Sequence, residues 1–599
     1  MRSPLLAGGM AALSLALLGG ASLAVLAAAA PGPALNAAPA NGPAASLKGL
    51  CLAAAKTETR PFAVEPARAA DPLWFLRDGL GSPPLYDGLG AHGYRITTAV
   101  PEAQLYFDQG LRLAYGFNHA EAARAFREAQ RRDPSCAMCF WGEAYVLGPN
   151  INAPMMPEAA APAFAAAQKA LALAGGARPE ERALIEAVAQ RYAPDAPADR
   201  SALDRAYAEA MADAAQRFPD DAEIGVLYAE ALMDLQPWDY WQPGGREPKG
   251  GIGAAVATVE RILAQQPDHP GAIHFYIHLV EASDRPQRAE PHADRLRTLV
   301  ASAGHLVHMP SHIYYRIGRF ADALEANSRA VAADEAYLAQ VPAQGIYPGA
   351  YYPHNIHFLM TSAQMGGDGA TAVAAAEKLG RALDDAIVRA VPWTQPIKQA
   401  PYFAHAQYSD PDAVLALPDP GDEFPFVRAA WHYARGVALA AKGDAAAARA
   451  EGAAIARIGQ APEMMRLEQL GVPAGTVLGI ARLVLDGRIA LAGGDPARAR
   501  QDFAQAVALQ DGIAYMEPPF WYYPVRQSLG AALLQAGDAE GAEQAFRAAL
   551  QQSPNNSWVL FGLREALAAK GDRAGAGEAD RRLQQAWIGT RGPLDLKRL

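Results

Sequence analysis

The strongest constraint on the fold of this chain is a spacing that recurs along it. A small residue is followed twelve positions later by an alanine, and then often by an aromatic residue and another alanine. Small residues let two amphipathic helices approach closely, so each copy predicts a packed pair of helices. The copies are Gly110, Ala122, Phe126 and Ala129; Gly487, Ala499, Phe503 and Ala506; Gly530, Ala542, Phe546 and Ala549; and, more faintly, Gly436 and Ala448.

Length and composition agree with a repetitive helical fold. The chain has 599 residues, more than one compact core usually holds, and it is rich in alanine and poor in β-branched residues. These properties predict an open-ended all-α array and disfavour a large sheet. The net charge is −10 and no long basic run is present, which argues against a nucleic-acid partner.

The repeated units resemble the tetratricopeptide repeat (TPR) family. The match is specific at 107–134 and 526–554, where Pro134 and Pro554 end the second helix, and weaker copies cover most of 100–590. The resemblance implies an all-α helix–turn–helix solenoid, a right-handed superhelix whose first helices line a concave groove. We expect an N-terminal array over 100–375, which carries the histidines described below, and a C-terminal array over 425–590.

The N-terminus predicts export. Residues 1–30 begin with Arg2 and continue as an uncharged apolar stretch, which is typical of a signal peptide. The stretch is also long enough to span a bilayer, so an uncleaved N-terminal anchor stays open as an alternative. Residues 31–70 are rich in Ala, Pro and Gly and are expected to form a linker. We therefore expect a bacterial-type exported protein, periplasmic or extracellular, with membrane attachment through the N-terminal segment as the alternative.

Nine of the thirteen histidines lie between residues 269 and 357, and seven of them have helix-face spacing. Offsets of three, four and seven residues place side chains on one face of a helix. His274 to His308 and His278 to His312 are each 34 residues apart, which is the length of one helix–turn–helix unit. The seven residues are His274, His278, His305, His308, His312, His354 and His357.

The register of these histidines predicts a metal site. All seven occupy three rungs of the first-helix face in consecutive units, the face that the TPR resemblance turns toward the groove. Imidazoles from helices about 8–10 Å apart can meet on one transition-metal ion. Glu281 continues the His274 and His278 face and could ligate the metal or orient a histidine, and Tyr315 is a candidate hydrogen-bonding partner.

The pattern leaves the metal and the chemistry open. Copper or iron is favoured over zinc, and seven histidines suit two adjacent metals, or one metal with titratable neighbours. If the site is catalytic, oxidative chemistry on a small-molecule or peptide substrate suits it best, with metal-assisted hydrolysis second. No P-loop, G-x-S-x-G, H-E-x-x-H or dinucleotide motif is present.

Two readings without a metal compete with this interpretation. The histidines could form a hydrogen-bonded polar groove, or a pH-sensitive surface that binds a peptide. The rival function is accordingly a non-enzymatic scaffold that holds a peptide or protein partner in the same groove. A scaffold would expose Lys, Arg and Asn along the groove, whereas residues 270–360 place His and Tyr there.

Three further segments bear on the site. Cys136 and Cys139 form a C-x-x-C at a repeat junction. In an exported protein this motif favours a local disulfide, with redox or metal-delivery activity as the alternative. We expect that neither cysteine takes part in the histidine site. Residues 235–252 lengthen one turn and are expected to form a loop over the groove. The aromatic stretch 516–524 either folds into the groove or forms a hydrophobic edge between repeats.

Overall fold

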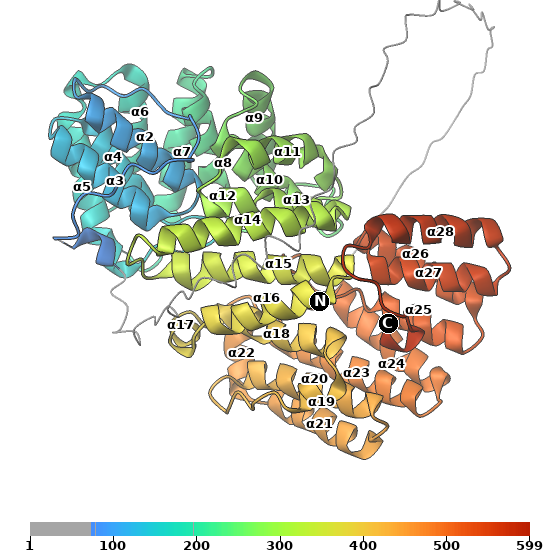
Figure 1. Ribbon diagram of the computed structural model, residues 1–599. Helices are drawn as coiled ribbons and strands as arrows, with labels where there is room; N and C mark the ends of the chain where they lie inside the picture. Colours follow the sequence, from blue (N-terminus) through green and yellow to red (C-terminus); the bar gives the residue numbers. More distant parts are fainter. Residues whose placement is uncertain (1–72, 78, 196) are drawn as a thin grey trace, which may run out of the picture. The chain divides into compact units, whose positions relative to one another are not determined.

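The computed structural model describes residues 73–77, 79–195 and 197–599 (Figure 1). The expected signal peptide or anchor at 1–30 and the linker at 31–70 lie outside these residues. In the described part of the chain the regular structure is helical throughout, which confirms the all-α fold class. No helix in that part is both long enough and apolar enough to cross a membrane.

Helices between residues 100 and 300 form the first part of the array. Their bounds are α2 (Pro101–Tyr115), α3 (His119–Arg132), α4 (Ala137–Leu147), α5 (Ala160–Leu173), α6 (Pro179–Ala189), α7 (Ser201–Arg217), α8 (Ala222–Asp234), α9 (Ile252–Gln265), α10 (Pro270–Glu281) and α11 (Glu290–Leu299).

The middle helices carry most of the histidine region and continue beyond it. They are α12 (Gly304–His308), α13 (Pro310–Ile317), α14 (Phe320–Leu338), α15 (Tyr352–Gly366), α16 (Gly369–Ala382), α17 (Asp385–Ala390), α18 (Gln395–Tyr408) and α19 (Pro411–Leu415). Short 3-10 or π turns, η1 to η7, lie between the longer helices; η5 (Tyr347–Tyr351) leads directly into α15.

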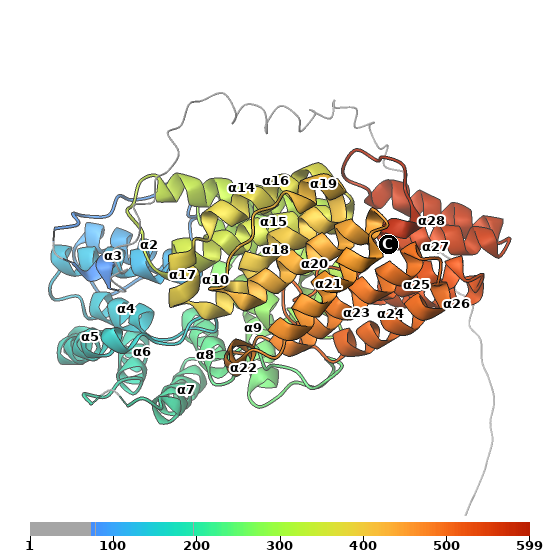
Figure 2. The ribbon, with the colours of Figure 1, turned by 90° about the horizontal axis from the view of Figure 1, so that it is seen from below.

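The last helices are α20 (Pro425–Ala441), α21 (Ala445–Ile458), α22 (Pro462–Gln469), α23 (Ala474–Ala492), α24 (Pro496–Asp511), α25 (Arg526–Gln535), α26 (Ala539–Gln552), α27 (Ser557–Ala569) and α28 (Arg573–Ala586). Each helix of a pair packs on its partner and on the following pair, as α20, α21, α23 and α24 do (Figure 2).

Glycine–aspartate turns separate the paired helices. Gly443 and Gly537 have φ values of 81° and 84°, a left-handed conformation that favours glycine. The aspartate that follows each glycine caps the next helix: Asp444 accepts from the backbone N–H of Ala447, and Asp538 from that of Gly541. The turn residues noted in the sequence therefore end one helix and begin its partner.

The glycine and the phenylalanine of the repeated pattern are in contact, and the same phenylalanine meets the glycine of the next unit. A Cβ atom on Gly530 would lie 2.8 Å from the ring of Phe546, and one on Gly562 would lie 2.2 Å from the same ring. Gly530 belongs to the first helix of the unit, Phe546 to its second helix and Gly562 to the first helix of the next unit. The ring thus fills the space that two missing side chains leave, and Phe126 makes the same contacts with Gly110 and Gly142.

Proline interrupts the helix that carries His305, His308 and His312. His305, His308 and His312 have the spacing of one helix, but α12 ends at His308 and α13 begins at Pro310. Proline lacks the N–H that would continue the hydrogen-bond ladder, and it is favoured at the start of a helix. The two short helices nevertheless keep all three side chains in one region.

The loop between α8 and α9 lies against α10. The indole N–H of Trp241 donates to the Leu279 carbonyl at 2.8 Å, and the backbone N–H of Asp284 donates to the Gly245 carbonyl at 3.0 Å. The ring of Trp238 meets the His278 ring edge-on at 5.2 Å between centroids. These contacts place the 235–252 loop beside the histidines.

Replacing Gly562 with alanine should destabilise the protein. The added methyl group would meet the buried Phe546 ring, and overpacking of this kind costs about 1–3 kcal/mol. Gly380→Ala is the matched control, because nothing lies within 4 Å of its Cβ position in α16. That variant should be more stable by about 0.5–1 kcal/mol. Urea denaturation of both variants measures the difference, and equal stabilities would contradict the glycine–phenylalanine account.

Candidate metal centre

The seven histidines singled out from the sequence come from four helices that pack together. His274 and His278 lie on α10, His305 and His308 on α12, His312 on α13, and His354 and His357 on α15. Helix α10 contacts α13, and α12 contacts both α13 and α15 (Figure 1).

Six of the seven imidazoles fall into two groups of three. Within each group, one nitrogen from every ring lies within 4.8 Å of the others. We call His274, His278 and His305 the first triad, and His308, His312 and His354 the second triad. Two nitrogens bound to one ion at about 2.0–2.1 Å are at most about 4.2 Å apart, so small side-chain rotations suffice for binding. His357 belongs to neither triad.

The triads are buried, which corrects the expectation of imidazoles lining an open groove. His274 and His308 have no exposed surface, and His278, His305 and His312 are 1% exposed; His354 is partly exposed. Aromatic rings enclose them: Phe117 lies 4.5 Å from His274, and Phe358 lies 4.6 Å from His312, between ring centroids. The sequence register identified the shared face but gave no sign of these covering rings.

The Nδ1 atoms of four triad histidines each face an oxygen acceptor. His274 Nδ1 lies 2.6 Å from the Tyr115 carbonyl oxygen, and His278 Nδ1 lies 2.7 Å from Glu281 Oε1. In the second triad, His312 Nδ1 is 2.6 Å from Glu281 Oε2, and His308 Nδ1 is 2.6 Å from Asn327 Oδ1. A carbonyl or carboxylate oxygen can only accept, so each Nδ1 donates its proton.

The orientation of the Asn327 amide is fixed independently. Its Nδ2 group donates to the Ala323 carbonyl oxygen at 2.7 Å, which leaves Oδ1 facing His308. This contact matters because an amide oxygen and nitrogen are otherwise assigned from their surroundings. His308 therefore carries its proton on Nδ1, as the other three histidines do.

Donation from Nδ1 leaves Nε2 as the free nitrogen of a neutral imidazole. Among the described residues, the Nε2 atoms of His274 and His278 have no hydrogen-bond partner. Those of His308 and His312 lie 2.8 Å apart, so a proton or a cation lies between them. Nδ1 bound to oxygen with Nε2 left as the donor atom is the usual arrangement of metal-ligating histidine.

Burial favours the neutral imidazole at five of the six triad histidines. Burial lowers the pKa of His274, His278, His305, His308 and His354, and neighbouring histidines lower it further for most of them. A neutral imidazole is the form that binds a metal.

Glu281 joins the two triads. One of its carboxylate oxygens accepts from His278 and the other from His312. Burial opposes ionisation of Glu281, but His312 and these two hydrogen bonds hold its pKa below the usual range. The carboxylate therefore lies beside the triads as an anion that orients one histidine from each.

Comparison with known proteins identifies the repeats. The tetratricopeptide repeat family matches residues 533–579, which run from the end of α25 into α28. Residues 533–579 are thus identified as tetratricopeptide repeat, and the paired helices in the rest of the described chain follow the same helix–turn–helix pattern. No protein of curated function matches it in sequence.

Solved structures share the helical architecture at low similarity. A human IFIT1 dimer with PPP-AAAA is 12% identical and aligns over 82% of this chain and 91% of that one, with a TM-score of 0.31. The P58(IPK) TPR domain is 13% identical over 61% of this chain and 93% of that one, with a TM-score of 0.17. Similarity at these scores carries no argument about the function of this TPR protein.

Two residues near Glu281 were not predicted as part of the site. The Tyr515 hydroxyl donates to Glu281 Oε2 at 3.0 Å, and Glu517 Oε2 lies 3.9 Å from His312 Nδ1. Burial raises the pKa of Glu517 well above its usual range, and Glu281 raises it further. The 516–524 stretch thus begins at the site, while Trp521 and Tyr522 pack against Phe403 in the core. Its aromatic, turn-rich composition indicated an unusual segment but not these contacts.

Tyr315 packs beside the second triad. Its ring lies 5.8 Å from the Phe358 ring and 5.3 Å from the Phe320 ring, between centroids. Phe358 in turn contacts His308 and His312, so Tyr315 supports the wall of the site through Phe358.

A third histidine–carboxylate group was missed by the sequence reasoning. Glu223 Oε1 lies 2.6 Å from His92 Nε2 and 3.1 Å from His269 Nε2, beside a cavity of about 400 Å³ lined by both histidines. Here His269 Nδ1 accepts from the Ala272 backbone N–H at 3.2 Å, so the ring proton lies on Nε2. This tautomer is the reverse of that in the triads, and Glu223 lies within ion-pair distance of both Nε2 atoms.

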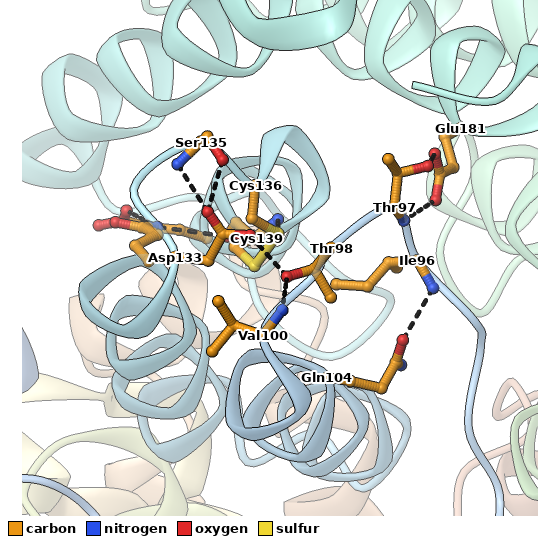
Figure 3. The surroundings of a disulfide bond; sticks show 12 residues. Ile96, Thr97, Thr98, Val100, Gln104, Asp133, Ser135, Cys136, Cys139 and Glu181 are labelled. Carbon is orange, nitrogen blue, oxygen red and sulfur yellow. Dashed lines mark hydrogen bonds between the residues drawn. A yellow bond between two sulfur atoms is a disulfide. The ribbon is translucent and has the colours of Figure 1, made fainter. Parts of the chain in front are cut away.

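Cys136 and Cys139 form a disulfide at the start of α4 (Figure 3). Asp133 orders the same junction by accepting from the hydroxyls of Thr98 and Ser135 at 2.5 and 2.6 Å. Neither cysteine belongs to a group with the histidines among the described residues. The disulfide therefore pins a junction between repeats.

His357→Leu should weaken the acid sensitivity of the metal-free protein. Burial lowers the pKa of His357 to about 3, so below about pH 6.5 the unfolded chain binds a proton that the folded chain does not. Stability from this residue is complete above pH 6.5 and is lost as the pH falls toward 3. Between pH 6 and 5 the unfolding free energy of the variant should fall by about 1 kcal/mol less than that of the wild type.

Urea denaturation in the presence of a chelator at the two pH values measures this difference. Met360→Leu, a buried change in the same helix that adds or removes no titrating group, should leave the pH dependence as in the wild type. An unchanged pH dependence in His357→Leu would contradict the assignment of a depressed pKa.

Proposed function

We propose that this TPR protein binds transition-metal ions in its buried histidine cluster. The observation that carries the proposal is the shared tautomer: four Nδ1 atoms face oxygen acceptors, which leaves Nε2 as the available ligand atom. Unpaired imidazole nitrogens also occur singly outside the cluster, at His119 and His357, so the support for a metal is the gathering of several ligand nitrogens within 4.8 Å of one another. Metal ions bound there would satisfy these nitrogens.

The proposed metal is copper or iron, with zinc as the third choice. Imidazole nitrogen suits all three, and no thiolate lies among the described residues of the cluster. We propose oxidative chemistry on a small reactant as the activity, because the enclosed triads leave little room for a peptide. Export to the periplasm or the extracellular space is part of the proposal and is supported by the composition of residues 1–30.

His308→Ala or His312→Ala should lower the metal content of the purified protein while helical content stays nearly unchanged. Both side chains serve the second triad, and the helices are held by the glycine–phenylalanine contacts elsewhere. Glu281→Gln should bind more weakly by about 10–100-fold, the usual cost of losing a partner that orients a ligand. Elemental analysis with circular dichroism measures both properties.

His292→Ala is the matched control. His292 is a half-buried histidine packed on Tyr276 outside the triads, and its loss should leave the metal content unchanged. Only trace metal in the wild type, after loading with copper, iron and zinc in turn, would refute the proposal and favour a scaffold that binds a protein partner. Joint loss of metal and helicity in His308→Ala would point to a structural ion.

A further inference from the structure

The six triad histidines offer ligand sets for two ions. Their nitrogens form two groups of three, and a further group, His278, Glu281 and His312, takes one histidine from each triad. The two sets are close neighbours, because His278 and His312 have ring centroids 5.4 Å apart across the boundary, against 6.4 Å for His278 and His305 within the first triad. Three imidazoles complete most of a four-coordinate shell, so each triad can hold its own ion.

Both triads are built in the same way around Glu281. Each contributes one histidine whose Nδ1 donates to this carboxylate, and each has a second whose Nδ1 donates to a neutral oxygen. His305, the third histidine of the first triad, makes no hydrogen bond through either ring nitrogen with the described residues. This matched construction predicts two similar sites that share one anion.

Charge limits which ions the pair of sites can hold. All six ligands are neutral imidazoles, and the nearby carboxylates are Glu281 and Glu517, with the Arg316 guanidinium 3.9 Å from Glu517. Even with both carboxylates ionised, these three groups supply a net charge of −1. Two divalent ions would leave +3 in a buried region, whereas two monovalent ions would leave +1. Uncompensated buried charge is costly, so the arrangement favours monovalent ions.

We propose that the triads bind a pair of copper ions, one in each triad, taken up as copper(I). Copper(I) is the monovalent transition-metal ion that imidazole binds, and three nitrogen ligands satisfy its low coordination number. The inference rests on the proposed metal-binding function and adds to it the number, the charge state and the identity of the ions.

Anaerobic titration with copper(I) against a chromophoric copper(I) chelator tests the inference. The wild type should take up two ions per chain. His305→Leu removes a first-triad ligand whose two nitrogens make no hydrogen bond with the described residues, and it should take up one. His354→Ala in the second triad should also take up one, and the double variant none.

His119→Leu is the matched control. His119 is a half-buried histidine near Phe117 whose Nε2 likewise has no hydrogen-bond partner in the described chain, but it belongs to neither triad. It should take up two ions. Circular dichroism checks the fold of each variant. If His305→Leu unfolds, His274→Gln replaces it, because the glutamine amide can still donate to the Tyr115 carbonyl.

The outcomes separate the inference from the proposed function. One ion in the wild type and none in either single variant would overturn the pair while leaving a single metal site. Zinc(II) bound at two per chain more tightly than copper(I) would overturn the charge argument and keep the pair. Absence of copper, zinc and iron binding would refute the inference and the proposed function together.

Discussion

The close approach of neighbouring helices at glycine is the constraint on which the candidate site depends. In the outer repeats a phenylalanine ring fills the space left by two glycines, as Phe546 does between Gly530 and Gly562. In the histidine region a related contact brings α10 against α2, because a Cβ on Gly271 would lie 2.5 Å from the Tyr115 ring. That short spacing lets the Tyr115 carbonyl accept from His274. A larger residue at 271 would separate the helices and break the contact that sets the histidine tautomer.

The repeat architecture could be predicted because its causes are local. The twelve-residue spacing encodes contacts between adjacent helices, and glycine–aspartate turns encode both the end of one helix and the cap of the next. Six of the seven histidines selected from their register lie in the two triads. His357 shares their periodicity but lies outside both triads. Helical spacing fixes the direction in which a side chain points, but it does not determine which residues of other helices contact that side chain.

Residues that reach the site from distant parts of the chain could not be predicted. Tyr515 contacts Glu281 from 234 positions away, and Asn327 orients His308 from the helix packed behind it. The break at Pro310 and the enclosure by Phe117 and Phe358 also depend on tertiary packing. His92, Glu223 and His269 have no common spacing, so nothing in their local sequence indicates that they meet.

The proposed metal binding would be coupled to stability. A buried polar atom without a partner costs about 1–3 kcal/mol, and the triads gather several such nitrogens. Ions that bound these nitrogens in the folded chain would remove that cost and would stabilise the fold by an amount that grows with the logarithm of their free concentration. The helices can carry the cost because the glycine–phenylalanine contacts that hold the repeats do not involve the histidines. The unpaired nitrogens of the cluster therefore destabilise the fold by an amount that the helix packing can offset, and bound ions would remove this destabilisation.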